Sequence, residues 1–239
     1  MLNTTDLQML KDSGISNEVI EARGYQSIAK GDCELYGFDW WQCRDGLLVP
    51  LWGTDGHIKG HQLRAYEPRI KKGSTKPIKY ETPSGQGNFL DINPLMLDLV
   101  KKNNQVIWIT EGAKKSDSLA SIGIPCISLK GVWGWRGTNE HQGKTAVGDW
   151  EDISIKGNPF VIAFDNDIHT NYAVLDAMHR LRKYLISRGA EPVGTLMLPY
   201  DPQNKMGVDD YIALVRSGHG RERYSRHAVQ KGNQRTIAS

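Results

Sequence analysis

Three short acidic segments in the second half of the chain each follow an apolar run that is typical of a buried strand. The carboxyl ends of parallel strands meet at one edge of a sheet, which is where open α/β sheets bind their ligands. Clustered carboxylates repel one another unless a cation holds them, and hard oxygen ligands suit Mg²⁺ or Mn²⁺. The sequence therefore predicts a divalent-metal site for phosphoryl transfer, with the candidate ligands Glu111, Asp165, Asp167, Asp209 and Asp210.

The local spacing supports this site and leaves simpler alternatives open. Asp165 and Asp167 are two residues apart, so at a strand end their carboxylates point to the same side. Gly112, directly after Glu111, allows a tight turn from strand to helix. A pair of aspartates can equally belong to an exposed turn, and Asp210 can serve as the cap of the helix that follows it.

A strongly basic strip lies upstream, between residues 59 and 79. Seven basic residues stand there against one acidic residue, Glu67, which gives a local charge of +6 where the whole chain carries only +3. Such a strip neutralises phosphates and releases counterions, so we expect salt-sensitive binding of nucleic acid; the alternative is a solvated loop. Tyr66 and Tyr80 can stack on bases, each contributing ~1–3 kcal/mol. The basic residues are Lys59, Arg64, Arg69, Lys71, Lys72, Lys76 and Lys79.

Tryptophans form two further groups. Trp133 and Arg136 follow an expected strand of the acidic half, where they can present an aromatic face and a positive charge to a nucleotide. Packing of Trp133 in the protein interior is the alternative. Trp40 and Trp41 are expected in the core, as large apolar side chains usually are.

The elements that must position these residues change in character along the chain. Residues 5–28 show helical spacing, with Ser16 as an N-cap and Gly24 at a helix end. Residues 47–66 predict two strands joined by an Asp-Gly turn, and a short strand is expected at 78–80. In the second half strands and helices alternate, which indicates parallel β-α-β units with right-handed crossovers. The expected strands are 105–110, 124–129, 160–164 and 193–198, and the expected helices are 95–102, 113–122, 171–188 and 209–217.

These elements predict an α/β fold and a division of the chain into four parts. Residues 1–30 form a helical N-terminal segment, and residues 31–95 form a basic, β-rich subdomain. Residues 96–218 form the catalytic domain, a mostly parallel sheet flanked by helices. Residues 219–239 carry many basic residues and few apolar anchors, so they are expected to form a flexible basic tail.

Composition argues against several other classes of protein. With 239 residues and a net charge of +3, the chain is long enough for one large or two modest domains and is not a bulk polyanion binder. Its cysteines, Cys33, Cys43 and Cys126, have no C-x-x-C spacing, so neither a zinc site nor a disulfide framework is expected. No secretory signal or membrane-spanning run is visible. We expect a cytoplasmic protein with no membrane partner.

The order of the acidic motifs resembles the TOPRIM domain, which primases, topoisomerases and certain nucleases share. Thr-Glu-Gly at 110–112 and Phe-Asp-Asn-Asp at 164–167 resemble its two signature motifs. Residues 205–211 resemble the acidic stretch that follows in bacterial-type primases.

The resemblance extends upstream of the acidic half. Residues 46–51, with Arg64 behind them, resemble the strand pair that precedes TOPRIM in bacterial-type primases, and Lys79-Tyr80 matches a Lys-Tyr element found there. Residues 10–217 are most similar to the primase-like segments of phage, plasmid and other mobile-element replication proteins, which are often fused to a helicase.

This resemblance implies a Rossmann-like TOPRIM fold preceded by a small α+β basic subdomain. The implied activity is that of a DNA primase, which makes short primers on single-stranded DNA from nucleoside triphosphates; a replicative helicase is a possible partner. Two or more Mg²⁺ or Mn²⁺ ions would be held by Asp165, Asp167 and one or both of Asp209 and Asp210, with Glu111 as a further ligand or general base. The residues implied in binding template or nucleotide are Arg64, Lys71, Lys72, Lys79, Tyr80, Lys115, Trp133 and Arg136.

The chain departs from bacterial-type primases in two ways. Those primases usually carry an aspartate four residues after the motif glutamate, where this chain has Lys115. Asp117 cannot replace it, because six residues along a helix lie on a different face from four; either one ligand is missing or Lys115 contacts a phosphate. No zinc ribbon precedes the core. Two alternatives therefore stay open, a TOPRIM nuclease and a non-catalytic module that binds nucleic acid.

Overall fold

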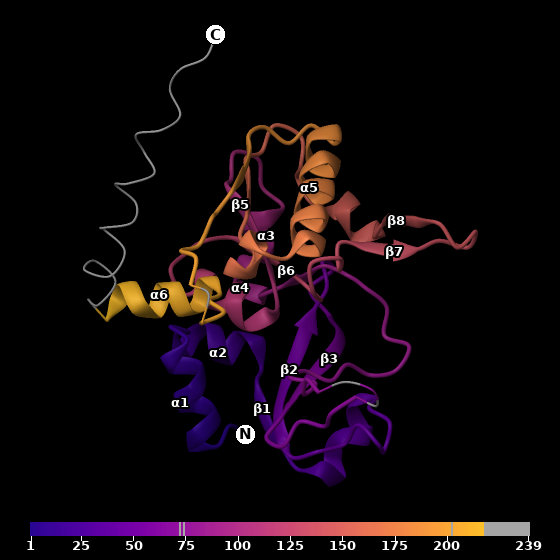
Figure 1. The fold of residues 1–239 in the computed structure, drawn as a ribbon, viewed down its shortest axis with the longest axis vertical. Coiled ribbons are helices and arrows are strands. Elements are labelled where there is room, and N and C mark those ends of the chain that lie inside the picture. Colours follow the sequence, from indigo (N-terminus) through magenta and orange to yellow (C-terminus); the bar gives the residue numbers. More distant parts are fainter. Residues whose placement is uncertain (72, 74, 202, 218–239) are drawn as a thin grey trace.

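The structure, a computed structural model, describes residues 1–71, 73, 75–201 and 203–217. Figure 1 shows two parts, a smaller N-terminal part built around an antiparallel sheet and a larger α/β part above it. Lys72 and the predicted tail at 219–239 lie outside the described residues. Within those residues, none of the helices is both long and apolar enough to cross a bilayer.

The N-terminal part packs two helices against a three-stranded antiparallel sheet of order β1-β2-β3. Its elements are α1 (Thr4–Asp12), α2 (Asn17–Arg23), β1 (Gln26–Ile28), the 3₁₀ helix η1 (Lys30–Tyr36), β2 (Gly46–Trp52) and β3 (Ile58–Ala65). Helix α2 begins where the Ser16 hydroxyl accepts a hydrogen bond from the Val19 N–H (3.4 Å), and it ends at Gly24, whose φ is 79°. Gly56, with φ 77°, lies in the turn between β2 and β3. Both features confirm the sequence-based predictions.

The larger part is a five-stranded sheet flanked by helices, which confirms the predicted α/β class. The strand order is β10-β9-β5-β6-β4, and all neighbours are parallel except the edge strand β4, which pairs antiparallel with β6. The strands are β4 (Asp91–Ile92), β5 (Ile107–Glu111), β6 (Cys126–Leu129), β9 (Phe160–Ile162) and β10 (Val193–Thr195). The helices are η2 (Pro94–Met96), α3 (Leu97–Val100), α4 (Ala113–Ala120), η3 (Gly148–Asp152), η4 (Asn166–His169), α5 (Tyr172–Ser187) and α6 (Val208–Arg216).

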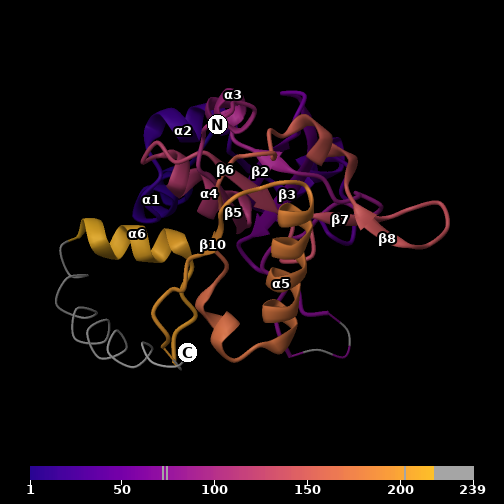
Figure 2. The ribbon, with the colours of Figure 1, turned by 90° about the horizontal axis from the view of Figure 1, so that it is seen from above.

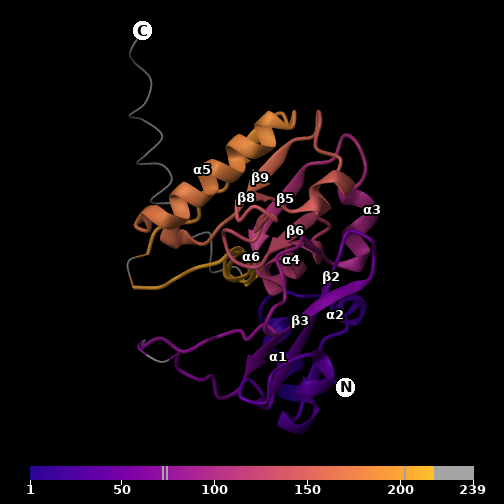
Figure 3. The same ribbon diagram turned by 90° about the vertical axis from the view of Figure 1, so that its right-hand side faces the viewer.

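Strands that are successive in the chain are added to this sheet in opposite directions on the two sides of the β5–β9 pair. From β5 the chain passes through α4 to β6 on one side, and from β9 through α5 to β10 on the other. Because such crossovers are right-handed, α4 and α5 cover opposite faces; Figure 3 shows α5 running along one of them. The carboxyl ends of β5 and β9 therefore form the topological switch point, where open α/β sheets bind ligands.

Two features differ from the sequence-based expectations. Strands β7 (Arg136–Thr138) and β8 (Lys144–Ala146) form a hairpin that projects from the molecule, in a span where the sequence predicted neither strand nor helix (Figures 1 and 2). Trp40 and Trp41, expected in the core, are 75% and 40% exposed. The guanidinium of Arg69 lies 4.5 Å from the Trp41 ring, so a cation–π contact takes the place of apolar packing on that face.

One apolar core runs through both parts. It joins Leu10 and Leu47 of the N-terminal part to Ile107 and Ile109 of β5, all of them buried. The N-terminal part is thus packed directly against the sheet whose carboxyl end carries the acidic segments.

A buried ion-pair network fixes α4 against the N-terminal part. Arg23 is fully buried and donates to Asp117 of α4 through Nε (2.9 Å) and Nη2 (2.6 Å), and it also pairs with Asp91 of β4. The Tyr25 hydroxyl donates to Asp117 as well (2.8 Å). Asp117 is therefore turned away from the acidic segments, as its place in the helix predicts, and the network sets where the first turn of α4 lies.

Candidate active site

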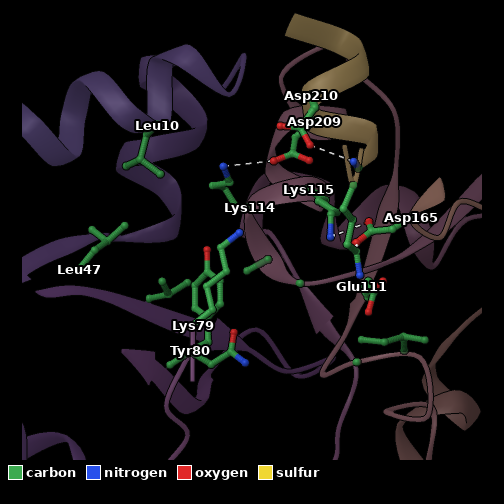
Figure 4. A pocket seen from close by; sticks show the side chains of 18 of the residues that line it. Leu10, Leu47, Lys79, Tyr80, Glu111, Lys114, Lys115, Asp165, Asp209 and Asp210 are labelled. Carbon is green, nitrogen blue, oxygen red and sulfur yellow. Dashed lines mark hydrogen bonds and ion pairs between the residues drawn. The ribbon is translucent and has the colours of Figure 1, made fainter. Parts of the chain in front are cut away.

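A cavity of about 450 Å³ lies between the two parts, at the switch point. Figure 4 shows that Lys79 and Tyr80 reach it from the N-terminal part, while Glu111, Asp165 and Asp209 reach it from the α/β part. The acids come from three separate places in the chain. Glu111 is the last residue of β5, Asp165 follows the end of β9, and Asp209 lies in the first turn of α6.

Gly112 makes the turn that starts α4. Its φ of +88° is rarely adopted by residues with a side chain, and its N–H donates to the Leu129 carbonyl of β6 (2.9 Å). The helix therefore begins directly after Glu111, and its first turn brings Lys114 and Lys115 to the cavity.

Asn166 holds the segment before α6 next to Asp165. Its backbone N–H donates to the Met206 carbonyl (3.0 Å), and its side-chain oxygen accepts from the Met206 N–H (2.8 Å). These bonds bring Lys205 and Gly207, which flank Met206, against the acids. Asn166 itself was not predicted as a site residue, because its role depends on the approach of a segment about forty positions away.

Lysines pair with the acids of the cavity. Lys115 Nζ lies 2.8 Å from Asp165 Oδ1, and Lys205 Nζ lies 3.1 Å from Asp165 Oδ2 and 2.9 Å from Asp167 Oδ2. Lys114 Nζ lies 3.2 Å from Asp209 Oδ2. Lys114 and Lys205 were not among the predicted site residues; their only sequence signal is their position beside the acidic motifs.

Burial and charge shift the acid–base properties of the site. Burial raises the pKa of Glu111, and the nearby Asp165 raises it further while Lys115 opposes the rise. Burial lowers the pKa of Lys115, but Asp165 and Glu111 outweigh it, so the net shift is upward. The charged form of Lys115 is therefore stabilised by these acids, whereas burial favours the protonated form of Glu111.

Lys79 lies close to other positively charged side chains. Burial lowers its pKa, and the neighbouring Lys114 and Arg64 lower it further because like charges repel. Within the described part of the chain, its ammonium group makes no ion pair or hydrogen bond. The Tyr80 ring lies beside it in the cavity lining. The positive charges of Lys79, Lys114 and Arg64 suit the binding of a negatively charged phosphate chain.

The acidic side chains have the donor chemistry of a divalent-metal site. Glu111 Oε1, Asp167 Oδ1 and Asp209 Oδ1 are buried oxygens without a hydrogen-bond partner in the described structure, and hard oxygen donors suit Mg²⁺ or Mn²⁺. However, no three His, Cys, Asp or Glu side chains of the described residues form a group that could hold one ion. Asp210 has a second role, since its Oδ2 accepts from the Gly207 N–H (2.9 Å) at the start of α6.

The remaining predicted residues divide between the cavity and other surfaces. Arg64, on β3, is close enough to affect the pKa values of Lys79 and Tyr80. The guanidinium of Arg136 lies 3.8 Å from the Trp133 ring, and both side chains lie outside the cavity lining. Lys71 is exposed in the loop after β3.

Comparison with known proteins shows which fold this is. Solved structures of bacterial-type primases are similar to this chain over nearly its whole length. Their sequence identity to it is low, so the similarity establishes the fold and nothing further. The *Aquifex aeolicus* primase, comprising zinc-binding and RNA polymerase domains, matches with a TM-score of 0.58 and 16% identity, over 94% of this chain and 55% of that one. The DnaG catalytic core matches with a TM-score of 0.57 and 17% identity, over 95% and 72%. A DnaG primase catalytic domain bound to single-stranded DNA matches with a TM-score of 0.55 and 16% identity, over 90% and 70%.

The chain thus spans little more than half of the *Aquifex aeolicus* chain that it matches. No curated protein sequence shows significant similarity to it. The model of one protein family, described as a domain of unknown function (DUF3854), matches residues 97–219, just over half of the 239 residues. The chain therefore belongs to the DUF3854 family.

Proposed function

We propose that this chain is a primase-type nucleotidyltransferase, which synthesises short primers on a single-stranded DNA template. The observation that carries the proposal is the meeting of Glu111, Asp165 and Asp209 at the switch point of a DnaG-like fold, across a cavity from Lys79 and Tyr80. Carboxylates facing cations across a cavity suit a reaction in which charge moves between phosphate oxygens.

In this proposal the acidic side of the cavity binds metal, and the side with Lys79 and Tyr80 binds the nucleotide. Asp165, Asp167 and Asp209 would hold a divalent ion, which when bound would neutralise charge on the transferring phosphoryl group. Lys79, without a carboxylate partner among the described residues, binds the phosphates of the incoming nucleotide. The Tyr80 ring stacks on a base or sugar.

Proton transfer is assigned to Glu111. Its pKa is raised by burial, so its carboxylate is a better proton acceptor than an exposed glutamate. It therefore takes the proton of the 3′-hydroxyl as that oxygen attacks the α-phosphate of the incoming nucleotide and pyrophosphate leaves. The template follows the basic strip that runs from β3 to Lys79, beginning with Arg64.

One observation favours a different candidate, a module that binds nucleic acid without catalysis. Both carboxylate oxygens of Asp165 are already paired with lysines, as would be expected of an acidic cluster that serves stability rather than metal binding. A TOPRIM nuclease would use the same acids with water as the nucleophile.

A primer-synthesis assay separates the three candidates. The full chain is incubated with single-stranded DNA, labelled ribonucleotides and Mg²⁺ or Mn²⁺. Short template-dependent products support the primase, degraded template supports the nuclease, and tight binding with neither supports the module.

Asp165→Asn and Glu111→Gln should each abolish synthesis while DNA binding persists, and Asp98→Asn, an exposed position in α3, serves as the matched control. Full synthesis by both site variants would contradict the assignment.

A further inference from the structure

Two lysines occupy the place where the acids of the cavity would take a metal ion. We propose that a divalent ion binds at Asp165 and Asp167 by displacing Lys205, while Lys115 stays in place as a permanent cation of the site. This inference rests on the proposed function, because it concerns the metal that the reaction requires.

Both carboxylate oxygens of Asp165 face a lysine. Its side chain is 5% exposed, its Oδ1 faces Lys115 Nζ at 2.8 Å, and its Oδ2 faces Lys205 Nζ at 3.1 Å. An ion that takes Asp165 Oδ2 as a ligand therefore competes with Lys205 for that oxygen. The same holds for Asp167 Oδ2, which pairs with Lys205 at 2.9 Å.

Lys205 is the lysine that can leave. Its side chain is 56% exposed, and it belongs to the irregular segment between β10 and α6. Displacement breaks its ion pairs with Asp165 and Asp167 but exposes little new surface, because more than half of the side chain already meets solvent.

Lys115 is held from several sides. Its side chain is only 20% exposed, and it extends from α4, which the Arg23–Asp117 pair fixes to the N-terminal part. The position of a Cβ on Gly207 would lie only 2.4 Å from Lys115 Cε, so the chain before α6 closes over the lysine stem. Withdrawal of Lys115 from Asp165 would require movement of α4 or of the segment before α6. Withdrawal of Lys205 requires only rotation of its own side chain.

Several carboxylate oxygens near Lys205 have the donor chemistry that a divalent cation requires. Asp209 is 3% exposed and lines the cavity, yet its Oδ1 has no hydrogen-bond partner in the described structure. Glu111 Oε1 and Asp167 Oδ1 are likewise buried and unpartnered. Displacement of Lys205 frees Asp165 Oδ2 and Asp167 Oδ2 as further oxygens for the ion.

The exchange predicts that Lys205 competes with the metal. In a titration with Mn²⁺ alone, followed by electron paramagnetic resonance of the free ion, Lys205→Met should bind Mn²⁺ at least tenfold more tightly than the wild type. Lys183→Met removes the same charge from an exposed position on α5 and should leave the affinity unchanged. Equal or weaker binding by Lys205→Met would overturn the proposal. Lys205→Gln, which keeps a polar end, provides a second variant if the first does not fold.

A labelling experiment on the wild type tests the displacement itself. Lys205 Nζ lies 3.1 Å from Asp165 Oδ2 and 2.9 Å from Asp167 Oδ2, so these ion pairs shield its amine from reagents while they persist. Acetylation of Lys205 by an amine-reactive reagent, measured by mass spectrometry, should therefore increase several-fold when Mn²⁺ is added, while acetylation of Lys183 stays constant. An unchanged rate at Lys205 in the presence of bound Mn²⁺ would contradict the exchange.

The two proposals fail in different ways. If the wild type makes primers with Mn²⁺ but neither the affinity of Lys205→Met nor the labelling changes, the exchange is wrong and the proposed function stands. If no variant binds Mn²⁺ and no primers form, both are wrong.

Discussion

Gly207 controls the geometry of the site through its lack of a side chain. An added Cβ would lie 2.4 Å from Lys115 Cε and 3.1 Å from Asp165 Oδ1, although the backbone φ of −99° suits any residue. We expect Gly207→Ala to push Lys115 away from Asp165 and to lower primer synthesis at least tenfold. Because the clash falls on a side-chain end, the free energy of unfolding should fall by less than about 1.5 kcal/mol.

Gly148→Ala is the control for this substitution, since nothing lies within 4 Å of the added Cβ there. Synthesis rates and urea unfolding are measured for both variants. Wild-type synthesis by Gly207→Ala would show that the position of Lys115 does not matter for the reaction.

Lys79 is expected to contribute to the binding of nucleic acid. Its ammonium faces Lys114 and Arg64, and repulsion between these groups is relieved when a phosphate lies among them. Lys79→Met should weaken the binding of single-stranded DNA by about tenfold, and it should reduce the slope of log affinity against log salt by about 0.7. Fluorescence anisotropy over a salt series measures both quantities. The same slope for Lys79→Met and the control Lys183→Met would remove Lys79 from the binding surface.

At the residue scale, the acids could be predicted from the sequence and their partners could not. Glu111 and Asp165 each follow an apolar strand, so their arrival at one sheet edge follows from parallel pairing. The pairing of Lys205 with Asp165 depends on how the segment before α6 crosses the end of β9, and no local pattern encodes that approach. The structure also assigns to Asp210 the capping role that the sequence had left as an alternative.

At the scale of elements, the Arg23 network holds α2, β4 and α4 together. Arg23 is fully buried, and without it Asp117 and Asp91 would be left as buried charges lacking their cation. We expect Arg23→Met to lower the free energy of unfolding by about 3–5 kcal/mol, measured by urea denaturation.

The matched control removes an arginine from an exposed ion pair. Arg180 and Asp176 lie one turn apart on α5, with side chains 58% and 52% exposed. Arg180→Met should cost less than about 1 kcal/mol. Similar losses for the two variants would mean that the buried network does not anchor α4.

The elements that the sequence predicted best are those with a strong local signal. The β2–β3 hairpin has an Asp-Gly turn after the apolar run of β2, and α2 has a cap at each end. The short strand expected at 78–80 is reduced to isolated bridges, Leu63 with Glu81 and Ile70 with Pro77. Strands β7 and β8 were missed because three-residue polar strands leave too few positions for an alternating pattern.

At the scale of the whole molecule, neither part contains the candidate site alone. The α/β part supplies the acids and three of the lysines, and the N-terminal part supplies Lys79, Tyr80 and the apolar floor around Leu10 and Leu47. Lys114 links the two parts, because its Nζ donates to the Ser13 hydroxyl at 2.6 Å while it pairs with Asp209. The shape of the cavity therefore depends on the two parts remaining docked.

The continuous core predicts that the two parts fold as one unit. Leu10 and Leu47 pack in the same buried cluster as Ile107 and Ile109, so separation would expose apolar surface on both sides. We expect a single unfolding transition, with coincident curves from far-ultraviolet circular dichroism and tryptophan fluorescence. A fragment of residues 97–217, which lacks the N-terminal face of this core, should show no cooperative transition. Two separated transitions in the full chain, or cooperative unfolding of the fragment, would mean that the α/β part is independently stable and that docking, rather than folding, assembles the cavity.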